Sequence, residues 1–429
     1  MAGPMAGHLR ILHRDTASQA RAGVVRTAHG EVRTPAFVPL ATKATIKGLL
    51  PAEVAALGYD MVLGNTFHLF LDPGHDLIAR FGGLHAFMGW NGPIVTDSGG
   101  FQVFSMGHGT VADEVKGRAP SGPERRGKIL AIEEDGVRFR SYLDGSEQRL
   151  GPERSMEIQA ALGSDLALVF DECTPFNVTR DYTARSTERT HRWLRRCLDW
   201  HAARGPQGQL VFGIVQGGVH RDLREDSAET VAGAGCDGIA IGGSLGEDKA
   251  QMHEVVGWTT TVLDRVAPEH PRHLLGIGEI DDLVRGVELG IDTFDCAMPT
   301  RLGRHGMALV PDPAGRWRVD LTQARWRESE EPLMDGCPCP ACAVGLTRGY
   351  LRYLARAREL TAMRLVTLHN LAFVERVMRR LREAVGEGTL AAVVATSNSD
   401  QAVELRRVVY DDVQQGVDAV KGLVNDNTK

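Results

Sequence analysis

Residues 210–218 read Leu-Val-Phe-Gly-Ile-Val-Gln-Gly-Gly, a short apolar run that ends in an amide and two glycines. A run of apolar and small residues without polar alternation is typical of a strand that is buried on both faces. Similar runs recur along the first three hundred residues, and a longer helical pattern follows each of them. This rhythm predicts βα units and a parallel sheet.

Eight such runs are present, which is the number that closes a (β/α)8 TIM barrel. They are residues 36–39, 61–63, 94–96, 166–170, 210–215, 238–241, 273–277 and 292–294. A doubly wound open sheet is the alternative α/β fold. It requires a Gly-x-Gly-x-x-Gly phosphate loop after the first strand, and no such motif follows residues 36–39. The pattern therefore favours the barrel.

Length, composition and cysteine usage indicate the size of the core and the cellular compartment of the protein. The chain has 429 residues, of which 43% are hydrophobic, so it can bury a large core as one barrel or as two to three smaller domains. It contains no apolar run near the roughly 20 residues of a membrane span and no apolar segment of a signal peptide at its start. Four of its seven cysteines are scattered singly, as in a reducing compartment. We expect a cytoplasmic protein without disulfides or membrane contact.

Three cysteines, Cys337, Cys339 and Cys342, lie within six residues, and His369 follows after an amphipathic stretch. Three thiolates and one imidazole predict a closed Cys3His site for one structural Zn²⁺. The alternative is a chance triplet in a disulfide-rich secreted protein, which the missing secretory signal disfavours. A closed site of this kind stabilises a small subdomain and performs no chemistry, so the function must be sought elsewhere.

The net charge is −6, but residues 341–383 hold nine arginines and three glutamates, a local charge of 9 − 3 = +6. Most charge runs are solvated helix faces, and contact with phosphate is the alternative, which the charge alone leaves open. Residues 348–365 have leucines and alanines at helical spacing and predict one helix.

The expected domain organisation is a barrel over residues 8–385 that includes a zinc-binding subdomain over 311–375. Residues 386–429 are expected to form a tail of unknown role. Residues 107–128 are rich in Gly, Pro, Arg and Glu without periodicity and predict a long loop after the third strand.

The active site of a (β/α)8 barrel lies at the C-terminal ends of its strands. Three carboxylates follow predicted strands there, namely Asp97, Asp171 and Asp295, and the amide of Gln216 follows another. Each aspartate alone is more often a helix N-cap than a catalyst, so it is their convergence at one mouth that favours a site.

Asp97 and Asp295 are expected on roughly opposite sides of the ring, where they can bracket a bond that is being broken. One carboxylate then attacks an anomeric carbon while the other moves a proton, as in glycosyl transfer. Asp171 accepts from N–H groups and Gln216 can donate to a carbonyl, and guanine offers both on one edge. Glycine pairs at 99–100 and 242–243 allow a flat ligand to approach the backbone closely.

These stretches resemble the bacterial queuine tRNA-ribosyltransferases, the tRNA-guanine transglycosylases. The resemblance is carried by Thr96-Asp97-Ser98-Gly99-Gly100-Phe101-Gln102, Phe170-Asp171-Glu172-Cys173, Gln216-Gly217-Gly218 and Phe294-Asp295-Cys296-Ala297-Met298-Pro299-Thr300-Arg301. It runs from about Arg33 to Glu383 and includes the cysteine cluster. Four motifs in one order, together with the metal ligands, make it specific.

The resemblance implies exchange of guanine for a 7-deazaguanine at wobble position 34 of tRNAs with GUN anticodons, a step of queuosine biosynthesis. It implies a covalent ribosyl-aspartate on Asp295 as the nucleophile, with Asp97 as proton acceptor and donor. The matching base pocket consists of Asp97, Ser98, Gly99, Gly100, Phe101, Asp171, Gln216 and Gly243. The target nucleotide must leave its stack to reach this pocket.

The resemblance also implies a tRNA anticodon stem-loop as a partner, and a homodimer. The matching RNA-contacting residues are Gly276, Ile277, Gly278, Glu279, Ile280, Asp281 and Asp282, and then Thr300, Arg301, Leu302, Gly303 and Arg304. Bacterial relatives commonly carry Gly-Lys-Pro at 278–280, so Glu279 replaces a charge that attracts phosphate with one that repels it.

The loop at residues 242–247 is one residue shorter than the bacterial Gly-Gly-Leu-Ala-Val-Gly-Glu. It faces the 7-substituent of the incoming base, and 7-aminomethyl-7-deazaguanine is expected rather than queuine. Two other functions compete with catalysis of base exchange. One is a non-catalytic partner subunit, which the presence of both Asp97 and Asp295 disfavours; the other is an unrelated barrel hydrolase of small nucleosides, which does not need the arginine-rich flank.

Overall fold

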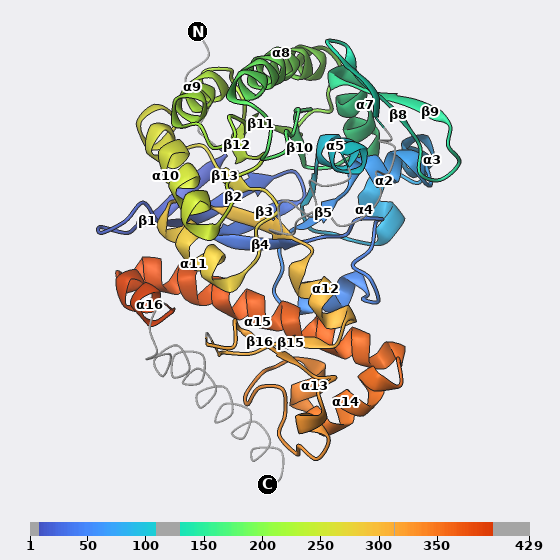
Figure 1. Ribbon diagram of the computed structural model, residues 1–429, viewed down its shortest axis with the longest axis vertical. Helices are drawn as coiled ribbons and strands as arrows, with labels where there is room; N and C mark the ends of the chain where they lie inside the picture. The colour runs from blue at the N-terminus through green and yellow to red at the C-terminus, as the bar shows by residue number, and fades with distance from the viewer. Residues whose placement is uncertain (1–7, 109–128, 313, 398–429) are drawn as a thin grey trace.

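The computed structural model describes residues 8–108, 129–312 and 314–397 (Figure 1). Nearly all of the loop predicted at 107–128 lies outside this range, as does the chain from residue 398 onward. Within the described residues no helix is long and apolar enough to cross a membrane.

Eight parallel strands form a nearly closed barrel, which confirms the predicted fold. Around the ring they are β4 (Ala36–Pro39), β14 (Thr293–Cys296), β13 (Arg272–Leu274), β12 (Gly238–Ile241), β11 (Leu210–Val215), β10 (Leu166–Leu168), β6 (Ile94–Thr96) and β5 (Val62–Gly64). The seam between β4 and β5 is joined just beyond β4, where the Ala41 N–H donates to the Leu63 carbonyl at 2.7 Å. All eight apolar runs of the sequence therefore contribute a strand.

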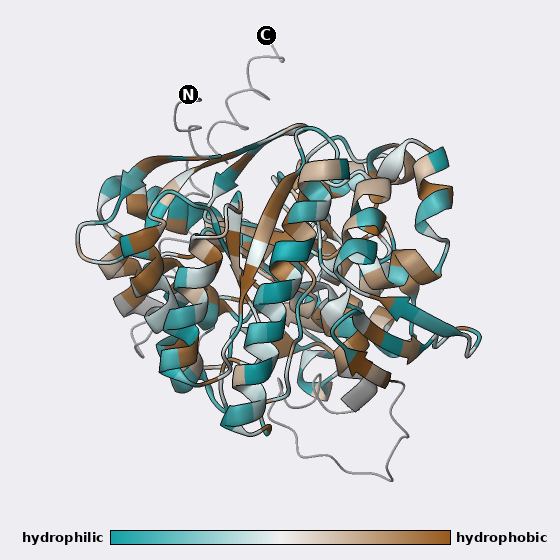
Figure 2. Cartoon of the chain, turned by 90° about the horizontal axis from the view of Figure 1, so that it is seen from above, coloured by the Kyte–Doolittle hydropathy of each residue, from teal (hydrophilic) through white to brown (hydrophobic). Residues whose placement is uncertain are grey.

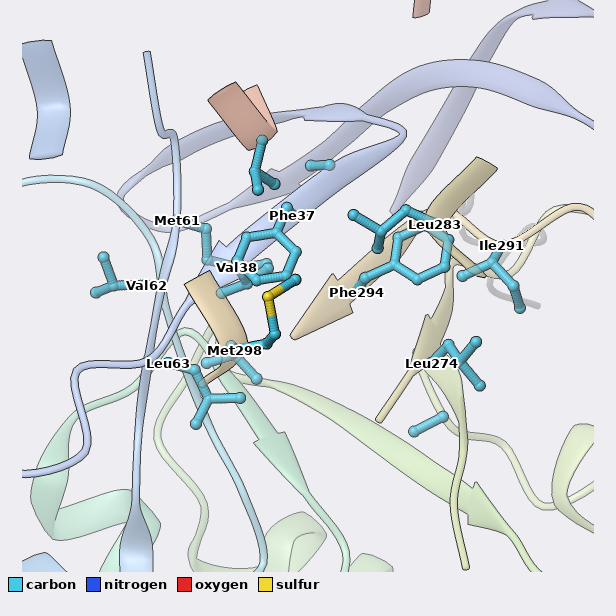
Figure 3. Packing of buried hydrophobic residues seen from close by; sticks show 14 of the residues in the cluster. Phe37, Val38, Met61, Val62, Leu63, Leu274, Leu283, Ile291, Phe294 and Met298 are labelled. Carbon is cyan, nitrogen blue, oxygen red and sulfur yellow. The ribbon is translucent and has the colours of Figure 1, made fainter. Parts of the chain in front are cut away.

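The strands are buried on both faces, as their composition requires. Every residue of β11 is buried, and Phe212 on this strand is in register with Gly238 on β12. A Cβ atom at Gly238 would lie 2.4 Å from the Phe212 ring, so the aromatic side chain fills the space that the glycine leaves. Figure 3 shows Phe37, Leu63, Leu274 and Phe294, which come from four strands, in the apolar packing.

Helices surround the barrel and turn hydrophilic faces outward (Figure 2). Those before residue 300 are α1 (Pro51–Ala56), α2 (Thr66–Leu71), α3 (His75–Arg80), α4 (Gly83–Met88), α5 (Gly100–His108), α7 (Pro152–Leu162), α8 (Arg180–Arg204), α9 (Arg221–Ala232), α10 (Lys249–Val266), α11 (Ile280–Glu288) and α12 (Met298–Arg304). The later ones are the 3₁₀ turn η1 (Ala324–Trp326), α13 (Pro340–Ala343), α14 (Arg348–Arg356), α15 (Leu360–Glu387) and α16 (Leu390–Ser397).

The single helix predicted over residues 348–365 is wrong. The chain forms α14 and α15 instead, and Arg358 between them has a left-handed φ of 60°. Leu351 and Leu365 are both buried, one on each helix, so the apolar spacing continues across the break. Apolar periodicity marks the buried face but does not reveal that the chain turns back, which the packing of α14 on α15 requires.

Three small antiparallel units lie outside the barrel and have no counterpart among the predicted elements. They are the sheet β1 (Leu9–Arg14), β2 (Arg21–Thr27) and β3 (Gly30–Thr34), the sheet β7 (Ile129–Glu133), β8 (Gly136–Arg140) and β9 (Glu147–Leu150), and the hairpin β15 (Met307–Leu309) and β16 (Arg318–Asp320). Most of these strands are short or carry several exposed residues, so their sequence patterns are weak, whereas β2 has five buried residues in a row.

Aspartates just before barrel strands bind the N-terminal segment to one end of the barrel. Four pairs between a basic side chain and an aspartate do this: Arg33–Asp60 at 2.8 Å, His29–Asp165 at 2.8 Å, His8–Asp237 at 3.2 Å and Arg21–Asp292 at 2.5 Å. Each aspartate precedes its strand, so all four lie at the N-terminal ends of the strands. The opposite end, where the candidate site is expected, remains uncovered by this segment.

His29, His85 and Asp165 form a cluster at this end in which donors converge on one carboxylate. His85 Nε2 lies 3.1 Å from the Gly92 carbonyl and 3.2 Å from Asp165 Oδ2. Because both are acceptors, this nitrogen carries a proton, whereas a metal ligand needs a free lone pair there. The cluster therefore joins the segments that carry His29, His85 and Asp165 by hydrogen bonds.

Candidate active site and metal centre

Asp97 follows β6 and lies at the mouth of the barrel, held by the residues that follow β5. Asn65 Nδ2 donates to its Oδ2 at 2.5 Å, and the Thr66 N–H donates to its Oδ1 at 2.8 Å. Burial raises the pKa of Asp97 to about 7, the Thr66 hydrogen bond opposes this rise, and the charge of Asp295 adds to it. A carboxyl group with this pKa can both accept and donate a proton near neutral pH.

Asp295 lies on β14, and two hydrogen-bonding groups of the described residues meet on one of its oxygens. The Gly276 N–H donates to Oδ1 at 3.0 Å, and His273 Nε2 lies 3.1 Å from the same atom. Between Asp295 and Asp97 the ring contains only β4 and β5. The two strands are three steps apart in a ring whose largest separation is four, which agrees with the expected placement of the two carboxylates on roughly opposite sides of the ring.

Asp171, Gln216 and Ser98 converge in one buried polar cluster. Gln216 Nε2 donates to Asp171 Oδ2 at 2.6 Å, and Ser98 Oγ donates to Asp171 Oδ1 at 3.0 Å. Burial raises the pKa of Asp171 to about 6, although the hydrogen bonds from Gln216 and Ser98 act in the opposite direction. The three residues follow β10, β11 and β6, which are neighbours in the sheet, so the barrel order itself assembles the cluster.

Glycines border this cluster where a side chain has no room. A Cβ atom at Gly100 would lie 2.8 Å from the Asp171 carbonyl oxygen, and one at Gly243 would lie 2.1 Å from Gln216 Oε1. Gly243 also has a left-handed φ of 81°. Its N–H reaches the Cys173 thiol, whose pKa is raised by burial, so this amide already has a partner. Phe101 at the start of α5 is 40% exposed and offers a ring face to solvent.

Three residues without a predicted role support the site. Asn65 orients Asp97, His273 contacts Asp295, and Arg224 binds the loops after β11 and β12. The Arg224 guanidinium is fully buried and donates to the carbonyls of Val215, Gly218, Gly242 and Ser244. Burial lowers its pKa to about 9. Asn65 directly follows a strand, which is a usable signal. His273 lies within β13, and nothing in the sequence distinguishes it, or Arg224 on α9, as part of a site.

The stretch from 276 to 282 is largely engaged within the protein. Ile280 and Asp282 are buried, and Asp282 binds Lys249 at 3.1 Å and His253 at 3.1 Å. Asp281 Oδ1 accepts from Trp317 Nε1 at 2.5 Å. Glu279 forms an ion pair with Arg318 on β16. The exposed part of this stretch is consequently its beginning, around Gly276.

Residues 300–304 belong to α12, which lies directly against α15. A Cβ atom at Gly303 would lie 2.7 Å from the Thr367 backbone, so only glycine allows this close approach. Asn370 on α15 accepts from the Leu309 N–H at 2.7 Å and donates to the Pro299 carbonyl at 3.0 Å. Arg301 and Arg304 keep partly exposed side chains, whereas Thr300, Leu302 and Gly303 are buried.

The four predicted metal ligands meet around one point. The Sγ atoms of Cys337, Cys339 and Cys342 lie 3.6, 3.5 and 3.5 Å from His369 Nδ1. A tetrahedral zinc with bonds of about 2.3 Å to sulfur and about 2.0 Å to nitrogen separates these atoms by roughly 3.5 Å. His369 Nε2 lies 2.8 Å from the Leu309 carbonyl and donates to it, which leaves Nδ1 free as a ligand. The cluster is compatible with a structural metal site.

At least six of the nine arginines in the arginine-rich flank have partners within the protein, and two of these, Arg352 and Arg376, donate to backbone carbonyls. Four of its arginines form ion pairs: Arg348 with Glu331, Arg364 with Glu53, Arg380 with Glu383 and Glu387, and Arg382 with Glu375. The charge of this run therefore serves largely to hold α14 and α15 against neighbouring segments. Arg356 and Arg358 remain exposed near the end of α14.

Fold and site together define a (β/α)8 enzyme with a pair of carboxylates and a buried polar cluster at the barrel mouth, residue types that glycosyl transfer uses. Residues 15–402 match the family model described as queuine tRNA-ribosyltransferase. The queuine tRNA-ribosyltransferase of Roseiflexus sp. (strain RS-1) is 52% identical over 388 residues, which cover 88% of this chain and 96% of the relative. That of Pelotomaculum thermopropionicum is 45% identical over 387 residues, covering 90% and 96%.

The chain therefore belongs to the queuine tRNA-ribosyltransferase family, the tRNA-guanine transglycosylases, which are pentosyltransferases.

Proposed function

We propose that this protein exchanges guanine at the wobble position of GUN-anticodon tRNAs for a 7-deazaguanine, as a step of queuosine biosynthesis. The observation that carries the proposal is the placement of Asp171, Gln216 and Ser98 on neighbouring strands beside the coupled carboxylates of Asp97 and Asp295. A pocket for the guanine edge thus adjoins two groups suited to glycosyl transfer.

In the proposed reaction an Asp295 carboxylate oxygen attacks C1′ of the ribose, and the C1′–N9 bond breaks. Its electron pair leaves with guanine, and Asp97 in its protonated form supplies the proton that neutralises the departing base. Asp97 then removes a proton from the incoming 7-deazaguanine, whose nitrogen displaces the Asp295 oxygen from C1′. The pKa of about 7 at Asp97 suits a group that must act in both directions.

The base pocket would use both hydrogens of the Gln216 amide. One already donates to Asp171 Oδ2 at 2.6 Å, and the other can donate to O6 of the base. The Asp171 carboxylate would accept from N1–H and the exocyclic amine. Gly99, Gly100 and Gly243 would admit the ring close to the backbone, and Phe101 would stack on it.

We propose that the anticodon stem-loop binds across the start of the 276–282 stretch and the partly exposed arginines of α12, Arg301 and Arg304. The pairing of Glu279 with Arg318 lessens the repulsion of phosphate that Glu279 alone would cause. For the incoming base, the short loop at 242–247 leads us to favour 7-aminomethyl-7-deazaguanine over queuine.

We propose one structural Zn²⁺ per chain, held by Cys337, Cys339, Cys342 and His369. When bound, the ion would provide stability and no reaction step, because its four protein ligands leave no open coordination position. Its ligand His369 is adjacent to Asn370, which holds α12, so the metal would stiffen the RNA-contacting helix. Several other expectations remain predictions. They are the homodimer, the cytoplasmic location, the domain bounds of 8–385 for the barrel and 311–375 for its subdomain, and the tail at 386–429.

The test is incorporation of radiolabelled guanine into an anticodon hairpin with the loop sequence uridine, guanosine, uridine, with unlabelled deazaguanines as competitors. Uptake is expected, and the stronger competitor identifies the incoming base. Asp295→Asn should abolish both uptake and the covalent complex on a denaturing gel, and exposed His13→Gln serves as the matched control. Wild-type exchange by Asp295→Asn would remove Asp295 from the nucleophile role. No uptake by metal-loaded wild-type protein would favour the partner-subunit function, and activity on free nucleosides without a hairpin would favour a hydrolase.

A further inference from the structure

His273 lies inside the barrel wall on β13, next to the strand that carries Asp295, and it is 2% exposed. Its ring bridges two residues of β14. Nδ1 lies 2.8 Å from Thr293 Oγ1, and Nε2 lies 3.1 Å from Asp295 Oδ1. The pairing of His273 with Thr293 across the parallel ladder fixes this arrangement, because neighbouring strands in register place their side chains side by side.

The acceptor chemistry of Asp295 settles how the hydrogens are arranged. An ionised carboxylate can only accept, so Nε2 must carry the proton that points at Oδ1. In the neutral ring Nδ1 is then an acceptor, and the Thr293 hydroxyl donates to it. Thr293 thus selects the tautomer of His273 in which the ring can hold the carboxylate.

The two donors to Asp295 bind the same carboxylate oxygen. Both the Gly276 N–H and His273 Nε2 reach Oδ1, and among the described residues no hydrogen bond is found on Oδ2. A carboxylate oxygen that already accepts two hydrogen bonds is a poorer nucleophile than one that accepts none. The distribution therefore leaves Oδ2 as the oxygen with its lone pairs available for attack.

We propose that His273, with its tautomer set by Thr293, is a positioning residue that holds Oδ1 of Asp295 and directs Oδ2 toward the anomeric carbon. This deepens the proposed function and rests on it, since it concerns the same step. Oδ2 forms the bond to C1′ as the C1′–N9 bond breaks and its electron pair leaves with the base. His273 keeps its Nε2 proton throughout and touches neither ribose nor base.

The test is the single-turnover rate of covalent complex formation with saturating anticodon hairpin, measured together with the KM of the hairpin. His273→Leu removes the donor and should slow the covalent step by about 10- to 100-fold, because a misdirected nucleophile loses near-attack geometry. The KM of the hairpin should stay within about twofold, since the proposal gives His273 no contact with RNA. His273→Gln places an amide N–H near the position of Nε2 and should restore most of the rate.

Thr293→Val provides a variant that leaves His273 in place but removes the hydroxyl that selects its tautomer, and a smaller loss of rate is expected. Thermal unfolding and metal content are measured for all three, with His13→Gln as the control. A wild-type rate in His273→Leu would overturn the proposal, as would equal losses in folded His273→Leu and His273→Gln. If His273→Leu does not fold, the rates of His273→Gln and Thr293→Val decide the matter. A wild-type protein that forms no covalent complex at all contradicts the proposed function itself, which is a distinct outcome.

Discussion

The amide of Gln216 and the carboxylate of Asp171 share a hydrogen bond of 2.6 Å in the buried wall of the barrel mouth. The pair joins the loops after β10 and β11, and it presents an acceptor and a donor side by side. Because the donors around Asp171 only partly offset its burial, its pKa stays near 6, within reach of experiment. Recognition of a base at this pair should therefore depend on pH.

We predict that the KM for guanine rises as the pH falls below about 6. The Asp171 carboxylate is ionised above its pKa and accepts from the base, whereas the protonated form loses that capacity. The measurement is the KM for guanine between pH 5 and 8. Asp171→Asn should raise the KM throughout and remove this pH dependence, and a variant that kept the wild-type profile would show that another group titrates.

A second prediction concerns the catalytic rate. Since Asp97 must act as an acid on the outgoing base and as a base on the incoming one, exchange should be fastest near pH 7 and fall on both sides. Asp97→Asn should lower the rate about 10²- to 10⁴-fold. Saturating single-turnover measurements test this, because they separate the rate from binding. A flat profile in the wild-type protein would argue against the dual role.

The metal cluster allows a third prediction. Cys339→Ser removes one of three thiolates and should reduce the zinc content well below one ion per chain, with weaker hairpin binding. Guanine binding should be largely retained, because the cluster is separate from the Asp171 pocket. Elemental analysis and hairpin titration measure the two effects. Cys236→Ser, which alters a buried cysteine outside the cluster, is the matched control, and full zinc occupancy in Cys339→Ser would refute the ligand assignment.

Asp165, at the N-terminal ends of the barrel strands, should make the stability of the folded protein depend on pH in acid. Burial alone would raise the pKa of Asp165, but donors from His85, Ile94 and His29 outweigh it and lower the pKa to about 2. A depressed pKa in the folded state stabilises the protein above the unfolded value near 4, and this contribution is lost as the pH falls toward 2. Asp165→Asn should therefore lower the melting temperature at pH 7 more than at pH 3. An equal loss at both values would exclude the linkage.

Local sequence determined those parts of this protein whose chemistry is local. A strand buried on both faces must be apolar along its length, so eight apolar runs were enough to predict the eight strands of the barrel. The triplet of Cys337, Cys339 and Cys342 predicts a metal site because such closely spaced thiolates can converge on one ion, and the cluster that they form with His369 is compatible with that prediction. The polar residues after the strands follow from the geometry of parallel barrels, in which all C-terminal strand ends open at one mouth.

Only the tertiary structure decided what depends on residues far apart in the chain. It placed Asp97 and Asp295 three strands apart, joined Arg21 to Asp292 across 271 positions, and paired Glu279 with Arg318. It also placed His273 beside Asp295, although in the sequence His273 is only the middle residue of the short stretch Arg272-His273-Leu274. The physical reason is that ring closure and side-chain pairing are set by the global register of the strands, while a sequence pattern reports only which face of each segment is buried.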